Sequence, residues 1–212
     1  MFSKIFVSII VPLTILVPIL SGVVCYRKLT AYAKTIFWYL VISAIVNTIG
    51  TFLGRVWHVN NLPLIHLFTV IEMLFLFAFY RNILNIARNN KWFNILIGAF
   101  IGINLVNILF FQSIYQYNSY TRTIEAFICI LFSLNYFAKL AATETKVTVL
   151  PGFYFNTGIF LYFSGAFMLF IFSNFLISKL STANFLILWS IQAGLFVIMY
   201  IFFTIGFILC KK

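Results

Sequence analysis

A succession of long apolar runs, which fills almost the whole chain, constrains the fold more than any other feature. A helix that crosses a bilayer needs about 20 mainly apolar residues. The chain contains seven runs of about this length, at residues 5–25, 36–54, 62–80, 92–111, 119–138, 153–177 and 184–209. The breaks between them are short and polar, so no stretch of the 212 residues remains for a soluble domain. We therefore predict an all-α integral membrane protein, a seven-transmembrane helix bundle that forms one polytopic domain over residues 1–212.

The first run follows Lys4, as the apolar core of a signal peptide would, but we expect it to be retained as the first span. Pro12 and Pro18 lie inside this run and predict kinks. Membrane helices tolerate such kinks when neighbouring groups satisfy the freed carbonyls. We therefore expect the first helix to bend around the bundle.

Lysine and arginine residues predict the orientation of the bundle, because cytoplasmic connections of membrane proteins carry an excess of both. Counted on alternate sides of the membrane, ten fall on one side and four on the other. The ten are Arg27, Lys28, Lys34, Arg81, Arg88, Lys91, Lys139, Lys146, Lys211 and Lys212, and the four are Lys4, Arg55, Arg122 and Lys179. This asymmetry predicts the N-terminus outside and the C-terminus in the cytoplasm.

The net charge of +11 comes from the same basic residues. They are spread over all the connections, where they can contact anionic lipid headgroups. They form no dense basic run. We therefore expect the lipid bilayer as a partner and no direct nucleic-acid binding.

Acidic residues and histidines are rare in this chain, and two of them lie within one apolar run. The chain has three acidic residues and two histidines. The third span contains His66 and Glu72, with Thr69 between them. Because a charged side chain in lipid is costly, such residues usually face a protein interior or a water-filled cavity. This span is therefore the first place to look for function.

The predicted orientation places other polar side chains at a similar depth. Glu72 lies about 9 Å deeper than His66 at 1.5 Å per residue. Arg122 and Glu125 enter the membrane from the same side in the fifth span. We predict an outward-facing ligand or proton pocket formed by His66, Thr69, Glu72, Arg122, Glu125, Asn47, Asn107 and Gln192.

The same residues also have a purely structural interpretation. Glu72 can pair with Arg122 and hold two helices together, and Arg122 and Glu125, three residues apart, can form an interfacial ion pair. Asn104 and Asn107 can form hydrogen bonds between helices. Both interpretations are open at the level of sequence.

Several reaction classes lack the residues they need. The chain has no aspartate, no P-loop and no lysine in the seventh span that could form a retinal Schiff base. Its three cysteines lack CxxC spacing, so we expect no metal and no cofactor. Intramembrane hydrolysis by Glu72 and Glu125, with His66 as proton carrier, is an alternative, although we favour a protein without enzymatic activity.

Two non-enzymatic classes remain. We favour a sensor, signalling or accessory protein whose outer pocket binds a small ligand and whose output passes to a cytoplasmic effector or through a homo-oligomer. The alternative is a small-solute or proton-coupled transporter or channel, because seven spans can form two three-helix repeats around a linker helix. No internal repeat is visible, since Pro12 and Pro18 have no counterpart in the fifth span.

Two stretches resemble an uncharacterised family of small seven-span proteins of Bacteroidota: NNLPLIHLFTVIE in the third span and PGFYFNTGIFLYFSGAFMLF in the sixth. The resemblance implies a bacterial multi-pass protein of the inner (plasma) membrane, with His66 and Glu72 as a family signature and no established activity. The family has a histidine in the last span where this chain has Gln192, which argues against a shared proton relay. A membrane accessory of a bacterial defence operon of the CRISPR type is a further alternative.

Overall fold

The computed structural model of the chain describes residues 10–143, 146–179 and 182–211. Lys4, Lys212 and residues 5–9 of the first expected span lie outside these ranges. In chain order the elements are α2 (Val11–Thr14), α3 (Leu16–Cys25), η2 (Tyr26–Lys28), α4 (Ala31–Arg55), α5 (Leu62–Ile83), α6 (Lys91–Val106), the π-helical η3 (Asn107–Phe111), α7 (Ser119–Ala141), η4 (Val147–Val149), α8 (Pro151–Lys179) and α9 (Thr182–Leu209).

The described residues form an all-α structure, as the sequence predicts. Seven of its helical stretches are long and apolar enough to cross a membrane. They are Val11–Lys28, Ala31–Arg55, Leu62–Ile83, Lys91–Phe111, Ser119–Ala141, Pro151–Lys179 and Ile187–Leu209. The chain is therefore a multi-pass membrane protein.

The first span is broken where its prolines lie. α2 ends at Thr14 and α3 begins at Leu16, so Ile15 interrupts the helix three residues from both Pro12 and Pro18. Proline lacks an N–H, and its ring clashes with the carbonyl four residues earlier, which for Pro18 belongs to Thr14. The broken span packs against α9 and so follows the outside of the bundle.

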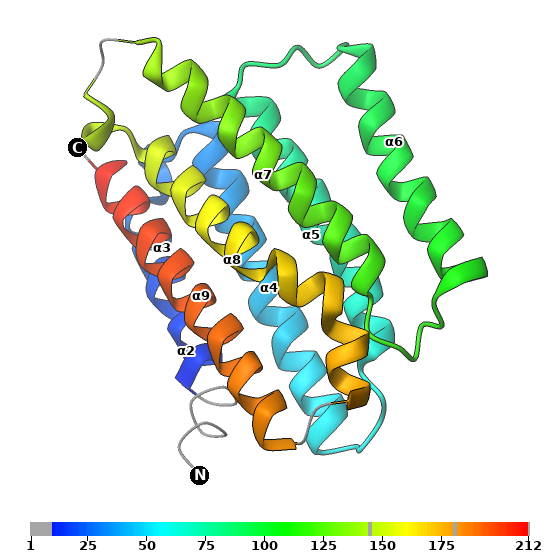
Figure 1. The fold of residues 1–212 in the computed structure, drawn as a ribbon. Helices are drawn as coiled ribbons and strands as arrows, with labels where there is room; N and C mark the ends of the chain where they lie inside the picture. Colours follow the sequence, from blue (N-terminus) through cyan, green and yellow to red (C-terminus); the bar gives the residue numbers. More distant parts are fainter. Residues whose placement is uncertain (1–9, 144–145, 180–181, 212) are drawn as a thin grey trace.

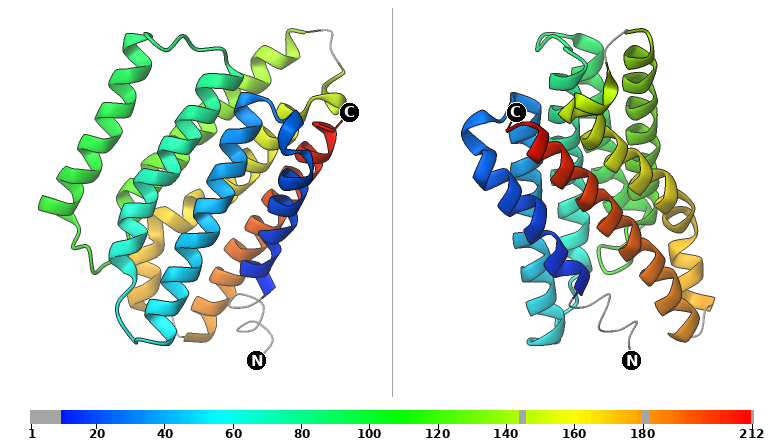
Figure 2. Two further views of the ribbon diagram at one scale, coloured as in Figure 1. Left: turned by 180° about the vertical axis from the view of Figure 1, so that it is seen from behind. Right: turned by 90° about the vertical axis from the view of Figure 1, so that its left-hand side faces the viewer.

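The helices pack with unequal closeness. α8 lies between α7 and α9, α3 covers α9, and α4 pairs with α5 (Figures 1 and 2). α6 stands at the outer edge, where α5 is its main helical neighbour. The bundle is therefore compact on the α8–α9 side and loose on the α6 side.

Two glycines of α8, Gly158 and Gly165, allow the close packing of α8 on α9. A Cβ atom at Gly158 would lie 3.2 Å from the carbonyl oxygen of Met199, and one at Gly165 would lie 2.8 Å from the side chain of Leu195. A larger residue at Gly158 would press on the backbone of α9, whereas one at Gly165 would require the Leu195 side chain to move. Around these contacts the core is aromatic, and its fully buried rings include Phe155, Phe163, Phe203 and Phe207.

The two ends of the bundle differ in charge. η2, the connection 84–90, residues 142–143 and 146–150 and the end of α9 lie at one end (Figure 1). The described basic residues of the larger predicted set lie in or next to these segments, so we call this the basic end. The connections 56–61 and 112–118 lie at the other end, which we call the pocket end.

Candidate functional site

Helix α5 brings three of the predicted site residues onto one buried face. His66, Thr69 and Glu72 are spaced by three residues, so they follow one another along one side of the helix. All three side chains are buried. They run from the pocket end of α5 towards the middle of the bundle.

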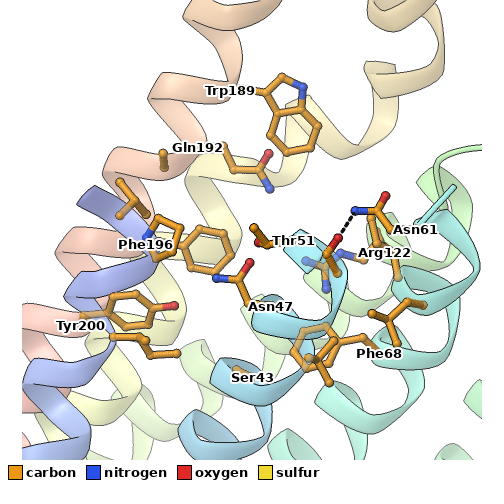
Figure 3. Close-up of a pocket in the computed structure, with 18 of the residues that line it drawn as sticks. Ser43, Asn47, Thr51, Asn61, Phe68, Arg122, Trp189, Gln192, Phe196 and Tyr200 are labelled. Carbon is orange, nitrogen blue, oxygen red and sulfur yellow. Dashed lines mark hydrogen bonds between the residues drawn. The ribbon is translucent and has the colours of Figure 1, made fainter. Parts of the chain in front are cut away.

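Two asparagines fix the start of α5. The side-chain oxygen of Asn60 accepts a hydrogen bond from the backbone N–H of Leu62 at 2.9 Å. Such a bond satisfies one of the free N–H groups that every helix start exposes. Asn61 donates to the carbonyl of Gly50 on α4 at 3.0 Å, which ties the two helices together (Figure 3).

Glu72 belongs to a group of five side chains that we call the ion cluster: Glu72, Arg122, Glu125, Tyr39 and Tyr162. Nη1 of Arg122 donates to Oε2 of Glu72 and also to Oε2 of Glu125, at 2.9 Å for Glu125. Tyr39 donates its hydroxyl proton to Oε1 of Glu72 at 2.8 Å, and the Tyr162 oxygen accepts from Nη2 of Arg122 at 3.4 Å. The cluster therefore joins α4, α5, α7 and α8.

The ion cluster holds more acid than base in a dry environment. Glu125 and Glu72 are 0% and 1% exposed, and Arg122 is 6% exposed. Burying an uncompensated charge is costly, and one guanidinium balances one carboxylate. The cluster is therefore neutral when one of its two carboxyl groups carries a proton.

Two polar atoms of the ion cluster have no hydrogen-bond partner among the described residues. They are Nε of Arg122 and Oε1 of Glu125. The guanidinium also lies 5.0 Å from the centre of the Phe170 ring, a distance at which a cation is attracted to an aromatic face. The cluster thus keeps one unused donor and one unused acceptor.

A second polar group, which we call the amide network, lies beside the ion cluster at the pocket end. It consists of Thr69, Asn107, Gln112, Asn118 and Ser119. Asn118 donates to the Thr69 hydroxyl at 3.1 Å, Asn107 donates to Gln112 at 3.2 Å and to Asn118 at 3.4 Å, and Gln112 donates to Ser119 at 2.8 Å. These bonds fasten the connection 112–118 to α5 and α7.

The α6 span reaches this network through Asn107, and α8 reaches it through Asn174. Asn107 opens η3 (Asn107–Phe111) and is buried there. Asn174 of α8 donates to the Ser119 hydroxyl at 2.9 Å. Asn104 instead donates to the carbonyl of Phe100 in its own helix at 2.9 Å.

His66 contacts a backbone carbonyl at the pocket end. Its Nε2 lies 3.0 Å from the carbonyl oxygen of Gln116. Its Nδ1 has no partner among the described residues. The structure therefore brings Glu72, Arg122 and Glu125 together and places His66 against the connection 112–118.

A cavity of about 330 Å³ opens beside the ion cluster (Figure 3). Its walls come from the first span, α4, α5, α7 and α9. Three predicted site residues line it: Asn47, Arg122 and Gln192. The other lining side chains with polar groups are Ser43, Thr51, Asn61, Tyr39, Tyr117, Tyr200 and Trp189.

Tyr117, in the connection 112–118, contributes a neutral hydroxyl to the cavity wall. Burial raises the pKa of Tyr117 above its ordinary value, and interactions with Arg122 and Gln192 oppose this rise. The hydroxyl is therefore protonated at neutral pH. It faces the same guanidinium that binds the two carboxylates.

The sequence did not single out several residues that build this site. Tyr39 and Tyr162 lie inside apolar runs rich in aromatic residues, so their hydroxyls carried no distinguishing signal. Asn118 and Gln112 lie in a tyrosine-rich connection, where polar residues are ordinary.

Within the described residues, no three His, Cys, Asp or Glu side chains lie close enough to hold a metal ion.

No protein-family model, curated protein or solved structure matches the chain. No family is therefore identified, and the resemblance noted above stays a prediction. The fold and the site define the class: a seven-helix membrane protein with a buried ion cluster beside a cavity.

Proposed function

We propose that this protein is a membrane receptor without enzymatic activity, which binds a small ligand in the cavity and signals to a separate cytoplasmic partner. The observation that carries the proposal is the double position of Arg122. Its guanidinium lies in the cavity wall and also binds both buried carboxylates of the ion cluster. A ligand at the wall therefore competes for the group that holds the cluster together.

The size and chemistry of the cavity support ligand binding. Small-molecule sites usually have volumes of about 300 to 1,000 Å³, with apolar walls and a few placed polar groups. This cavity, at about 330 Å³, combines the rings of Phe68, Trp189 and Phe196 with the amides of Asn47 and Gln192. Such a wall suits a small amphipathic molecule.

The ion cluster offers a route from the cavity to the rest of the bundle. Arg122 on α7 bonds to Glu72 on α5 and to Tyr162 on α8, so a change at Arg122 acts on three helices. Coupling between distant sites needs an element with two arrangements that both sites bias. We propose that the cluster is this element, and that a cytoplasmic effector or a second copy of the chain reads it at the basic end.

The arrangement of the carboxylates supports a receptor over a hydrolase. Glu72 and Glu125 both bind Arg122 through their Oε2 atoms. General acid and base catalysis requires each group to reach a proton of the substrate. Neither carboxylate belongs to the cavity lining, so a substrate in the cavity would meet Arg122 first.

Ligand binding can be tested with a variant that fills the cavity. Ala193 lines the cavity, and Ala138 lies on the exposed surface of α7, so Ala193→Leu and Ala138→Leu form a matched pair. Purified protein in nanodiscs is mixed with small organic acids, amines and amides, and its thermal unfolding is recorded. The proposal expects a saturable rise in Tm that Ala193→Leu abolishes and Ala138→Leu retains. No saturable rise in the wild type, or the same rise in Ala193→Leu, would overturn it.

The same probe separates a receptor from a carrier. Protein in proteoliposomes is given an inward gradient of the probe that binds, and the uptake of probe and of protons is followed. A receptor binds the probe without net flux. Uptake that Ala193→Leu abolishes would replace the receptor with the transporter alternative.

We also propose that the pocket end faces outside and the basic end faces the cytoplasm of a bacterium, in its inner membrane. Cys25 and Cys129 are buried, so a Cys210→Ser background permits labelling at one introduced thiol. Asn47→Cys, which lines the cavity, should react with an impermeant maleimide from outside intact cells. Ile49→Cys, on the exposed surface of the same helix, is the control and should stay unlabelled in lipid. Labelling of Asn47→Cys from the cytoplasmic side alone would show the opposite orientation.

A further inference from the structure

Resting on the proposed ligand binding, we infer that the ligand carries a carboxylate on an apolar body and that it binds together with one proton. Arg122 supplies the contact for the carboxylate. The pair of Glu72 and Glu125 takes up the proton. The result is a receptor whose affinity for an organic acid rises as the pH falls.

The charge of the cavity wall indicates an anionic ligand. Arg122 is the single charged residue among the described residues that line the cavity. Asn47, Thr51, Asn61 and Gln192 add neutral amides and a hydroxyl. A guanidinium with neutral neighbours complements a carboxylate, which it binds through two N–H groups.

Arg122 retains donor capacity for such a group. Its Nη1 serves both carboxylates, and its Nε, which is itself buried, has no partner in the described part of the chain. Its Nη2 makes a bond of 3.4 Å to Tyr162, which is longer than the usual range of about 2.7–3.2 Å. The Tyr117 hydroxyl and the Gln192 amide interact with the same region and offer further contacts.

The rest of the wall accounts for the apolar body. The rings of Phe68, Trp189 and Phe196 line the cavity together with aliphatic side chains. Figure 3 shows Trp189 and Phe196 on the α9 side of the cavity and Phe68 on the α5 side. A carboxylate at Arg122 would therefore extend its apolar part between these rings.

Proton uptake on ligand binding results from the charges of the ion cluster, which lies behind the cavity wall. With both carboxylates ionised, the ion cluster carries a net charge of −1, because Arg122 offsets one of them. This charge repels an incoming anion across a medium of low dielectric constant. When one carboxylate binds a proton from solution, the cluster becomes neutral and the guanidinium attracts the anion. At a pH where both carboxylates are ionised, binding of one anion thus takes up one proton from solution, which forms an O–H bond on one carboxylate and changes no other covalent bond.

Apart from Arg122, the titratable side chains around the carboxylate pair are uncharged at neutral pH. Among the described residues, the titratable groups that interact with the pair are Tyr39 from α4, Arg122 and Cys129 from α7, Tyr162 from α8, Tyr200 from α9 and Tyr117 from the connection 112–118. Tyrosine and cysteine are uncharged at neutral pH. The proton taken up on binding therefore goes to the carboxylate pair. Within the pair, Oε1 of Glu125 has no partner among the described residues.

A direct test uses 3-phenylpropanoate as the probe and 3-phenylpropanamide as its uncharged counterpart. Wild-type protein in nanodiscs is titrated with each, and Trp189 fluorescence reports binding, with Trp189→Phe as the control for the signal. The Kd of the acid should rise by up to about tenfold per unit between about pH 5 and about pH 9, while the Kd of the amide stays constant. At the high end of this pH range, a pH-indicator dye in weak buffer should report one proton taken up for each acid bound.

Glu125→Gln supplies a result that a merely damaged protein would not give. Glutamine resembles the protonated carboxyl group, so the variant should bind the acid at high pH more tightly than the wild type does. Its Kd should also depend little on pH. Arg122→Gln should bind the acid no better than the amide. An acid Kd that is independent of pH in the wild type, or weaker binding by Glu125→Gln at high pH, would overturn the inference.

The outcomes separate the two proposals. If acid and amide bind equally, and Ala193→Leu abolishes both, the cavity binds ligands but the inference about charge and proton fails. If neither produces a signal sensitive to Ala193→Leu, the proposed function fails as well. Dodecanoate in the nanodisc membrane tests the second source of a carboxylate: competition with the soluble probe assigns the site to membrane fatty acids.

Discussion

The ion cluster and the amide network lie side by side on α5 and α7 but are built on opposite principles. The amide network joins neutral groups, and Thr69, Asn118 and Gln112 each have hydrogen-bond partners. The ion cluster joins three charged groups, carries a surplus acid and leaves Arg122 Nε without a partner in the described residues. A neutral, bonded network holds a connection in place. A cluster with a surplus acid can exist in two protonation states.

The position of each group strengthens the contrast. The amide network anchors the connection 112–118, and none of its five members lines the cavity. The ion cluster reaches the cavity through Arg122 and Tyr39. Polar residues in membrane proteins can therefore serve packing and function within a single pair of helices. The two roles differ in whether all hydrogen-bonding groups have partners and in whether the group carries charge.

The largest expected effect is on stability when the cation is removed. Arg122→Met leaves two carboxylates buried without a counter-charge, so we expect the free energy of unfolding to fall by about 3–5 kcal/mol. Denaturation of the purified protein by SDS in bicelles measures this change. As a control, the triple variant Glu72→Leu, Arg122→Met, Glu125→Leu should recover most of the loss. A stable Arg122→Met protein would show that the cluster is not charged.

A smaller loss is expected in the amide network. Asn118→Leu removes the donor to Thr69 and the acceptor for Asn107, which should lower the free energy of unfolding by about 1–3 kcal/mol. Hydrogen exchange of the connection 112–118 should become faster. The pH dependence of acid binding should be retained, since the ion cluster is intact. If it disappeared, the two polar groups would be one functional unit.

Tyr39→Phe sharpens the comparison within the ion cluster. The change removes the hydroxyl that donates to Glu72 at 2.8 Å and leaves the ring in place. We expect a loss of about 1 kcal/mol in the free energy of unfolding, measured by the same SDS titration. Phe75→Leu, on the α5 side of the Tyr39 ring, is the control for packing. A loss as large as that of Arg122→Met would make Tyr39 the main partner of Glu72.

The smallest effect on stability is expected at the cavity wall. Asn47 is exposed and lines the cavity, so Asn47→Leu should change the free energy of unfolding by less than about 0.5 kcal/mol. The same change removes a polar contact of the ligand and should raise the Kd of 3-phenylpropanoate. Equal Kd values in variant and wild type would place the ligand away from α4.

The sequence predicts the fold class because spanning helices are a local property. Length and apolar content of each run decide whether it can cross a bilayer, and the seven described spans follow from them. The break in the first span was also foreseeable, since proline acts within its own helix. The orientation and the single domain over residues 1–212 stay predictions.

The site was predictable in part, because charged residues are rare here. Glu72, Arg122 and Glu125 stood out against apolar surroundings, and the structure brings them together. His66 shares a helix face with Glu72, yet the carbonyl of Gln116, fifty residues away, is its contact. Contacts of that kind depend on how the connection 112–118 folds back. The hydroxyl of Tyr39 depends in the same way on packing that no local pattern records.

The ion pair between Glu72 and Arg122 also has a consequence for the order of synthesis. The two residues are separated by fifty positions, so Glu72 leaves the ribosome first. At about 5–20 residues per second, it waits roughly 2.5–10 s for its partner to be made. During that interval α5 carries an acid without its cation. The inserting helix must therefore remain near the insertion machinery, or keep its acid protonated, until α7 arrives.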